Sequence, residues 1–536
     1  MRIALAFFAA LTSTLSIAGQ GRANIVWLSV EDMSPWIACY GDDTVATPNL
    51  DRLAASSVRY TNAFATSPVC APARSSLITG MYATRIGTMH MRTGNPSRAA
   101  LARDPEAYDE IPSYQGVPPA GVRCFPELLR AQGYYCTNAA KTDYQFKAPG
   151  TVWDVSSGKA HWRGRADGQP FFAVFNHGGT HESRAFPKAK WKPLVEPEDV
   201  VVPPLYPDTP AVREALARTY TNIATMDAWV GKRLDELEEA GLLESTYVFF
   251  FSDHGVGLPR GKRSPYDLGT RVPLLVRPPG GLETGTTDER VVSFIDFGPT
   301  VLSLAELETP EGSDGSAFLG PHHKPGSGFA FTHADRFDSV YDRARSVSDG
   351  RFRYVRNYDT SIPHLIPNAY RENLTMMADL IALRETDLLH SELWQCASES
   401  RPKEELYDSS MDPWETHNLA EDPAHEATLV RLRTALDEWI TSTGDLGLVL
   451  PEKRMVRECL WPDEQQPQTM AATMRLKERR IVLESSTRGA SIGYRTTDKD
   501  AWTVYTGPFD AAGISALQVL THRIGFAAAE GHFSLR

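Results

Sequence analysis

The amino-acid sequence predicts an α/β fold with a mixed, mostly parallel β-sheet flanked by helices. Buried parallel strands read as continuous apolar runs, and four such runs occur, at 24–30, 171–175, 246–252 and 273–277. Between the second and third runs, apolar residues recur every three or four positions over 211–241, which predicts an amphipathic helix. Because strands alternate with helical segments, we expect helices on both faces of the sheet.

The length of the chain indicates more than one folding unit. Its 536 residues exceed what a single hydrophobic core normally organises. A Pro- and Gly-rich stretch at 308–328 predicts an exposed boundary after the main domain. We predict four segments: a signal peptide at 1–23, the main α/β domain at 24–307, a smaller α+β subdomain at 308–465 and a small β-sandwich at 466–536.

The segments after this boundary carry their own secondary-structure signals. In the subdomain we expect a strand at 351–356, a turn-rich stretch at 405–413 and a helix at about 424–441. Further on, 480–496 and 502–509 read as short strands separated by Gly and Thr turns. This last pattern predicts the antiparallel sandwich.

The first residues have the pattern of an export signal. Arg2 precedes an apolar run that ends in small residues near Ala18. A transmembrane anchor, the alternative, needs about 20 apolar residues and usually a charged stop after them. We therefore expect a periplasmic or secreted protein with no membrane span once the signal is cleaved.

Charge and cysteine content narrow the function further. The net charge of -12 argues against sequence-independent binding of nucleic acid or of an anionic membrane, because both require surplus Lys and Arg. Six cysteines in so long a chain do not form a disulfide framework. Cys124 and Cys136 are near enough in sequence to pair in an oxidising compartment, and the sequence leaves this open.

Polar residues follow three of the predicted strands directly. These are Glu31-Asp32, Asn176-His177 and Asp253-His254. Ligands of open α/β sheets bind beyond the carboxyl ends of the strands, so we expect the three pairs to meet in one crevice. Carboxylates with one imidazole are suitable ligands for a hard cation.

The stretch Cys70-Ala-Pro-Ala-Arg74 carries the most specific chemistry. Pro72 suits the first turn of a helix, whose free N–H groups and positive end would lie at Cys70. Three interpretations follow from the residues alone: an anion site, a thiolate nucleophile activated by the helix and Arg74, or an inert buried cysteine.

These residues resemble the sulfatase family, formylglycine-dependent members of the alkaline phosphatase superfamily. Cys70 to Arg74 has the family pattern Cys-x-Pro-x-Arg, and the resemblance extends from about 24 to 441. Further matching stretches are 62–64, 77–82, 133–135 leading to Lys141, 249–255, and 405–408 with 412–413 and 418–420. The resemblance implies an alkaline-phosphatase-like fold and a sulfuric ester hydrolase.

The resemblance also implies roles for particular residues. Cys70 would be oxidised by a formylglycine-generating maturation enzyme, giving an aldehyde hydrate. One hydroxyl of the hydrate attacks sulfur, and the other expels the bound sulfate. Arg74, Lys141 and Lys262 would surround the hydrate and the sulfate oxygens, and His181 would contact the sulfate and protonate the leaving alcohol.

By the same resemblance, a Ca²⁺ ion, or Mg²⁺ as the alternative, would bind beside the nucleophile. Its ligands would be Glu31, Asp32, Asp253, His254 and the modified Cys70. The ion would act as a Lewis acid and lower the pKa of the hydrate.

Two positions depart from the family pattern. Glu31 stands where the family usually has Asp, although a flexible calcium shell accepts the longer side chain. The second signature usually reads Gly-Lys-x-His, whereas Ala140-Lys-Thr-Asp143 lacks the histidine. Asp143 in place, or His90 from another loop, are the two candidates to replace it.

Several residues are candidates for contact with the substrate. His90, Arg92, Arg336 and Asp338 lie in loops suited to grip a sugar or its carboxylate. The stretches 489–496 and 505–509 resemble the small β-sandwich of chitobiase-type carbohydrate-active enzymes. Both observations favour a sulfated carbohydrate as substrate. A phosphoryl-transfer hydrolase of the same superfamily and a non-catalytic glycan-binding protein with a degenerate site are the alternatives.

Overall fold

A mixed eight-stranded sheet forms the centre of the computed structural model, which describes residues 22–91, 112–188, 191–383, 391 and 393–535. The predicted signal peptide falls almost entirely outside these residues, and Arg92 lies outside them too. In spatial order the strands are β4 (Val155–Ser156), β3 (Tyr135–Ala139), β5 (Phe171–His177), β1 (Asn24–Val30), β6 (Thr246–Ser252), β7 (Arg271–Arg277), β2 (Val58–Phe64) and β8 (Thr286–Ser293).

Strand directions confirm the mostly parallel sheet. β1 pairs in parallel with β5 and β6, and only β7 runs against both of its neighbours, β6 and β2. All seven residues of β1 are buried. The centre of the sheet is therefore covered on both faces, as its continuous apolar sequence predicts.

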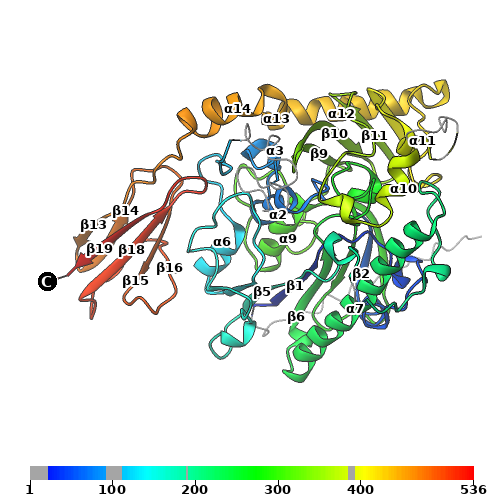
Figure 1. Ribbon diagram of the computed structural model, residues 1–536. Coiled ribbons are helices and arrows are strands. Elements are labelled where there is room, and N and C mark those ends of the chain that lie inside the picture. Colours follow the sequence, from blue (N-terminus) through cyan, green and yellow to red (C-terminus); the bar gives the residue numbers. More distant parts are fainter. Residues whose placement is uncertain (1–21, 92–111, 189–190, 384–390, 392, 536) are drawn as a thin grey trace, which may run out of the picture.

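Two groups of helices cover the two faces (Figure 1). One face packs against α1 (Pro48–Ala54), α7 (Pro210–Glu239) and α10 (Met377–Ala382), and the other against α2 (Cys70–Thr79), α6 (Phe125–Ala131) and α9 (Phe297–Leu304). The predicted helix at 211–241 is α7. Shorter helices are α3 (Ala83–Ile86), α8 (Asp267–Thr270), α11 (Trp394–Ala397), α13 (Leu446–Val449) and α14 (Glu452–Met455).

An antiparallel four-stranded sheet follows in the chain. Its order is β12 (Glu404–Asp408), β11 (Phe352–Asn357), β10 (Val340–Ser348) and β9 (Ala330–Phe337). Helix α12 (Glu426–Thr443) packs on it, with the ring of Trp439 stacked on Phe331 at 5.2 Å between centroids. The predicted strand at 351–356 is β11, and the predicted helix at 424–441 is α12.

Two small antiparallel sheets end the chain. One contains β13 (Thr473–Lys477), β14 (Arg480–Glu484) and β17 (Phe509–Asp510), and the other contains β16 (Thr503–Val504), β15 (Ser491–Arg495), β18 (Ala516–His522) and β19 (Ala529–Ser534). Side chains from both sheets share one apolar core, so the sheets form a sandwich. We call residues 466–535 the sandwich.

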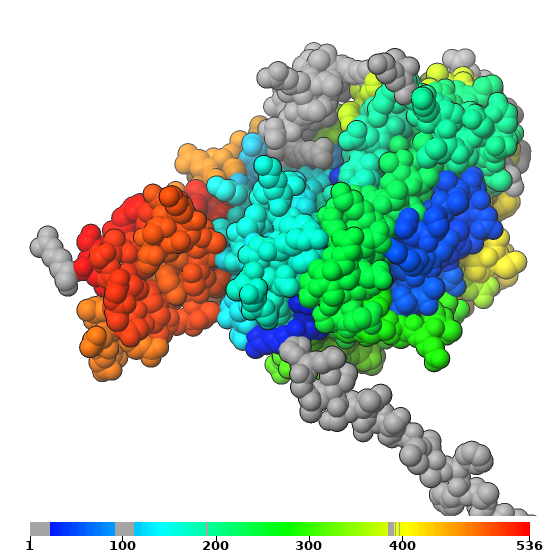
Figure 2. Space-filling view, turned by 90° about the horizontal axis from the view of Figure 1, so that it is seen from below, coloured from blue at the N-terminus to red at the C-terminus, as the bar shows by residue number. Residues whose placement is uncertain are grey.

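The sandwich lies against the segment that runs through α6 (Figure 2). Ile524, just after β18, is 4% exposed and belongs to the core beneath the main sheet. Among the described residues, no helix is long and apolar enough to cross a membrane. Cys124 and Cys136 are buried free thiols, so the pairing that the sequence left open does not occur.

Candidate active site

The two central strands place four polar residues side by side at their carboxyl ends. β1 is followed by Glu31 and Asp32, and the adjacent parallel strand β6 by Asp253 and His254. The backbone N–H of Asp253 donates to the carbonyl of Val30, which holds the two strand ends in register. The two strand ends therefore bring these polar side chains together, and we call the space between them the crevice.

Cys70 is the first residue of α2 and faces this crevice. The residue before it, Val69, has extended backbone and provides no side-chain cap for the N–H groups of Cys70 and Ala71, and uncapped groups at a helix N-terminus favour an anion. Cys70 is 1% exposed, and its Sγ lies 3.3 Å from Nε2 of His254 and 3.8 Å from Nζ of Lys262.

His254 is fixed in one orientation. Its Nδ1–H donates to the carbonyl of Gly255 at 2.9 Å, so Nε2 faces the crevice, 3.1 Å from Oδ1 of Asp32 and 3.5 Å from Oδ1 of Asp253. Burial lowers the pKa of His254, but the two carboxylates outweigh it and raise the pKa to about 10. The site therefore attracts positive charge at Nε2.

Asp32 divides its two oxygens between two tasks. Oδ2 accepts from Nζ of Lys262 at 2.8 Å and from the backbone N–H of Glu182 at 2.7 Å, whereas the buried Oδ1 faces Nε2 of His254 at 3.1 Å. Burial raises the pKa of Asp32, but the charge of Lys262 holds it well below its usual range. An ionised, buried carboxylate whose second oxygen faces an imidazole nitrogen is a suitable ligand for a cation.

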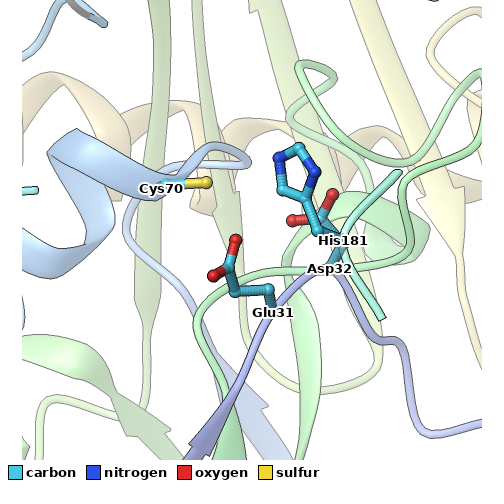
Figure 3. A group of neighbouring side chains, drawn as sticks. All are labelled: Glu31, Asp32, Cys70 and His181. Atoms are coloured by element: carbon cyan, nitrogen blue, oxygen red, sulfur yellow. The ribbon is translucent and has the colours of Figure 1, made fainter. Parts of the chain in front are cut away.

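The donor atoms around Cys70 satisfy the requirements of a metal site. One atom from each of Asp32, Cys70, Asp253 and His254 lies within 4.8 Å of the others. The same holds for Glu31, Asp32, Cys70 and His181, whose side chains converge in Figure 3. Carboxylate oxygens with one imidazole fit a hard divalent cation such as Ca²⁺.

Arg74 and Lys141 add positive charge to the group around Cys70. Nε of Arg74 donates to Asp253 at 2.9 Å, and Nη1 donates to Oδ1 of Asn176 at 2.8 Å. Nζ of Lys141 lies 2.7 Å from Glu31 and 3.8 Å from Asp143. Asp143, which occupies the position of the absent signature histidine, therefore lies beside Lys141.

His181 and Lys262 complete the group. Nε2 of His181 is 3.2 Å from Nζ of Lys262, and Nδ1 is 2.9 Å from the hydroxyl of Ser183. Burial and then Lys262 lower the pKa of His181, which favours the neutral imidazole. The structure thus brings together all the residues predicted for catalysis and for the metal.

The sequence interpretation missed two charged residues that touch this group. Glu182 and Arg263 are both buried and form a bidentate ion pair with N···O distances of 2.9 and 2.8 Å. Each directly follows a predicted site residue, His181 or Lys262. This adjacency is the only signal in the sequence, because the two residues are 81 positions apart.

The described residues predicted to contact the substrate have partners within the protein, and their contact with substrate stays a prediction. His90 is completely buried, its Nδ1 accepts from the backbone N–H of Arg336, and its Nε2 lies 3.5 Å from Glu452. Arg336 is itself paired with Glu452 at 2.5 Å, and Asp338 with Arg263 at 2.7 Å. These side chains are used by internal networks, and none of the interactions among the described residues joins His90 to Cys70 or Lys141.

Comparison with known protein families and sequences gives a consistent result. The sulfatase family, described as "Sulfatase", matches residues 23–165 and 160–307. An ulvan-active sulfatase of Formosa agariphila is 40% identical, over 94% of this chain and 90% of its own. Human N-sulphoglucosamine sulphohydrolase is 30% identical, over 83% of this chain and 95% of its own.

Solved structures share the fold at low sequence identity. One, in complex with its substrate D-glucosamine-2-N,6-O-disulfate, matches with a TM-score of 0.55 and 16% identity over 81% of this chain and 100% of that chain. The phosphonate monoester hydrolase of Agrobacterium radiobacter has a TM-score of 0.52 and 16% identity over 86% of this chain and 100% of that chain. At 16% identity, both similarities show the shared fold alone.

Proposed function

The chain belongs to the sulfatase family, and from this premise we propose that it desulfates a sulfated carbohydrate, using a formylglycine made from Cys70 and a bound Ca²⁺ ion. Hydrolysis of sulfate esters follows from the family. The nucleophile, the metal and the sugar are our proposals.

The observation that carries the proposal is the position of Cys70. It lies at the free N-terminus of α2, 3.3 Å from His254 and 3.8 Å from Lys262. An inert buried cysteine does not need this concentration of charge. A formylglycine hydrate at this position supplies the attacking oxygen and the second hydroxyl that releases sulfate.

The surrounding side chains then have separate tasks. The N–H groups of α2, Arg74 and Lys262 stabilise negative charge on the sulfate oxygens as it develops. His181, held neutral by burial and Lys262, takes up the proton that the attacking hydroxyl loses and passes it to the leaving alcohol.

The metal is proposed from the donor set. Asp32, Asp253, His254 and Glu31 would hold Ca²⁺, with Mg²⁺ as the alternative. When bound, the ion supplies Lewis acidity and lowers the pKa of the nucleophile. Lys262 and the N–H of Glu182 orient Asp32 for this task by occupying its other oxygen.

The choice of a carbohydrate substrate rests on the relatives. Two curated relatives carry names that specify sulfated sugars, ulvan and N-sulphoglucosamine. We propose a sulfated glycan for this chain and, from the apolar run after Arg2, export to the periplasm or the medium.

The first experiment is the mass of the tryptic peptide 60–74 from protein produced with a maturation system, followed by sulfate release from ulvan and glucosaminoglycan oligosaccharides. We expect an aldehyde at Cys70 and release of sulfate. Aryl sulfate and aryl phosphate assays on the same sample distinguish a sulfatase from a phosphoryl-transfer enzyme. A thiol at Cys70 in active protein would contradict the proposed nucleophile.

Cys70→Ala should abolish turnover, because no other group in the crevice supplies two hydroxyls. The matched control is Cys459→Ala, since Cys459 is exposed and free and should be dispensable. Both variants should keep the thermal unfolding temperature of the wild type within a few degrees. Substantial activity in Cys70→Ala would exclude the formylglycine mechanism.

A further inference from the structure

A buried chain of ion pairs leads from Lys262 to the C-terminal subdomain. Lys262 contacts Glu182, Glu182 pairs with Arg263, and Arg263 pairs with Asp338, just after β9. Asn368 donates to the same oxygen of Asp338 at 2.9 Å. The chain thus crosses from the catalytic crevice to another part of the fold.

Lys262 needs such support because of its chemistry. An ammonium group at the end of a flexible four-carbon stem has no preferred orientation of its own. Its Nζ lies 2.8 Å from Asp32, 3.2 Å from His181 and 3.5 Å from Glu182. Of these three contacts, Glu182 is the one that connects Lys262 to Arg263 and, through it, to Asp338.

The guanidinium of Arg263 joins two carboxylates, those of Glu182 and Asp338. Its two terminal nitrogens bind both oxygens of Glu182, and its Nε donates to Asp338 at 2.7 Å. Its φ of 75° is in the left-handed region, which a non-glycine residue adopts only when its surroundings hold it there. The backbone N–H of Arg263 donates to the carbonyl of Pro68 at 2.7 Å, in the loop before Cys70.

A second buried guanidinium, that of Arg371, adds positive charge that the carboxylates of Glu182 and Asp338 balance. Arg371 is 1% exposed, donates to the backbone carbonyl of Lys262, and has an Nε without a hydrogen-bond partner. Burial and then the charge of Arg263 lower its pKa to about 10. Three cations, Lys262, Arg263 and Arg371, therefore surround Glu182 and Asp338.

We infer that Glu182, Arg263 and Asp338 are positioning residues that fix the ammonium of Lys262 beside Cys70. None of the three is proposed to contact the sulfate group itself. Glu182 contacts Lys262 directly, and Asp338 acts through Arg263. The inference deepens the proposed function, on which it rests, because it concerns how the same site holds the sulfate group.

Binding of inorganic sulfate tests the inference, because electrostatics and positioning predict opposite changes in sulfate affinity. Glu182→Gln removes a negative charge near the anion site, so electrostatics alone predicts tighter sulfate binding. Loss of positioning predicts weaker binding, because Lys262 no longer points at the anion. We expect the calorimetric Kd for sulfate to rise about tenfold, and kcat to fall about 10- to 100-fold, since small misplacements cost that much.

The matched control is Asp342→Asn. Asp342, in β10, forms a buried bidentate ion pair with Arg401, of the same type as the pair of Glu182 with Arg263. This variant should lose thermal stability to a similar degree while keeping the sulfate Kd and kcat of the wild type. If Glu182→Gln matches the control in every measurement, or binds sulfate more tightly, the inference is overturned.

Asp338→Asn provides a second test if Glu182→Gln does not fold. Its side chain is 22% exposed and forms no ion pair with Lys262, so a milder change of the same sign is expected, a two- to fivefold weaker sulfate Kd. An unchanged or tighter Kd would overturn the inference.

The wild-type protein distinguishes failure of the inference from failure of the proposed function. Wild-type protein that binds sulfate but hydrolyses no sulfate ester would contradict the proposed function. Wild-type protein that does not bind sulfate would contradict the inference.

Discussion

At the scale of single residues, the site is organised by carboxylates that use each oxygen differently. Oδ2 of Asp32 accepts two hydrogen bonds, while its buried Oδ1 faces Nε2 of His254. Asp253 likewise accepts from Arg74 through Oδ2, and from the backbone N–H of Asp32 through Oδ1. The convergence of these carboxylate oxygens with Nε2 of His254 is therefore the most specific indication of a cation.

Asp32→Asn should weaken calcium binding, because the substitution removes a charged ligand and introduces an N–H donor in the site. In the wild type, calcium at 100 times its Kd should stabilise the fold by about 2.7 kcal/mol. We expect most of this gain to disappear in the variant. The measurement is the unfolding temperature after chelation, as calcium is added back.

Asp227→Asn is the control for this experiment. Asp227 is also a buried carboxylate with several hydrogen bonds, but its partners are Asn49 and Leu50, away from Cys70. It should keep the full calcium-dependent shift. A full shift in Asp32→Asn as well would show that calcium binds elsewhere.

The limits of sequence interpretation are visible in the same residues. Cys70, Asp253 and His254 could be predicted because each lies in a short motif at a strand or helix end. Glu182 and Arg263 could not, since their pairing arises only when segments 81 residues apart meet. The sequence also does not indicate whether the ring of His90 faces a crevice or a buried network; in the structure the ring is completely buried beside Glu452, and its contact with substrate stays a prediction.

At the scale of elements, burial determines which strands can be predicted from an apolar run in the sequence. β1 and β6 are buried on both faces and read as continuous apolar runs. Edge strand β8 is largely exposed, and β2 is only partly buried, so neither has that pattern. The antiparallel direction of β7 could not be predicted, because an apolar run has the same composition in either direction.

The loop after β6 requires a glycine at position 255. A Cβ atom there would lie 2.0 Å from the carbonyl oxygen of Leu268 and 2.7 Å from the backbone of Gly269. Gly255→Ala should therefore push the loop away and displace His254, whose Nδ1–H donates to the Gly255 carbonyl. We expect at least a tenfold loss of kcat and weaker calcium binding.

Gly158→Ala is the matched control, because a Cβ at Gly158 has no atom within 4 Å. It should leave kcat, calcium affinity and unfolding temperature unchanged. Wild-type kinetics in Gly255→Ala would show that the loop has room to adjust and that the position of His254 does not depend on this contact.

Strand β18 contains a buried histidine with a predictable effect on stability. Burial and then Lys147 lower the pKa of His522 to about 4, and its Nε2–H donates to the carbonyl of Phe526 at 3.1 Å. The unfolded chain takes up a proton near pH 6.5, whereas the folded one does so only near pH 4. His522 therefore contributes stability above pH 6.5 that is lost as the pH falls toward 4.

His522→Gln keeps an N–H donor but cannot titrate. Its unfolding temperature should fall less between pH 7 and pH 4.5 than that of the wild type. His417→Gln, at an exposed histidine, should follow the wild type. Equal pH dependence in all three proteins would show that His522 is not protonated on unfolding in this range.

At the scale of the whole molecule, the sandwich is joined to the catalytic domain and does not hang from a linker. Arg123, just before α6, donates to the carbonyl of Gly489 at 3.0 Å and to the hydroxyl of Ser491 at 2.7 Å. Ser491 also donates to Glu127 at 2.9 Å. The short strands of the sandwich could be predicted from the sequence, but this docking could not, because its partners are more than 360 residues apart.

The docking supports the loop that carries Lys141. After β3 this loop continues through Tyr144 and Phe146, which share a hydrophobic core with Ile524 of the sandwich. Further along, Gly150 has Leu520 and Trp502 as its neighbours. The sandwich therefore restricts the movement of a segment that begins at the catalytic crevice.

Ile524→Ala tests whether this contact matters for the enzyme as a whole. Removing the buried side chain should destabilise the protein by about 2–5 kcal/mol and loosen the loop, so kcat should fall severalfold well below the unfolding temperature. Ile481→Ala is the control, since Ile481 is completely buried in the sandwich's own core. That variant should lose similar stability but keep kcat, because its docking surface is intact. If both variants keep the wild-type kcat, the sandwich stabilises the protein without influencing Lys141. If kcat falls only in Ile524→Ala, the sandwich contributes to catalysis through its packing against the catalytic domain.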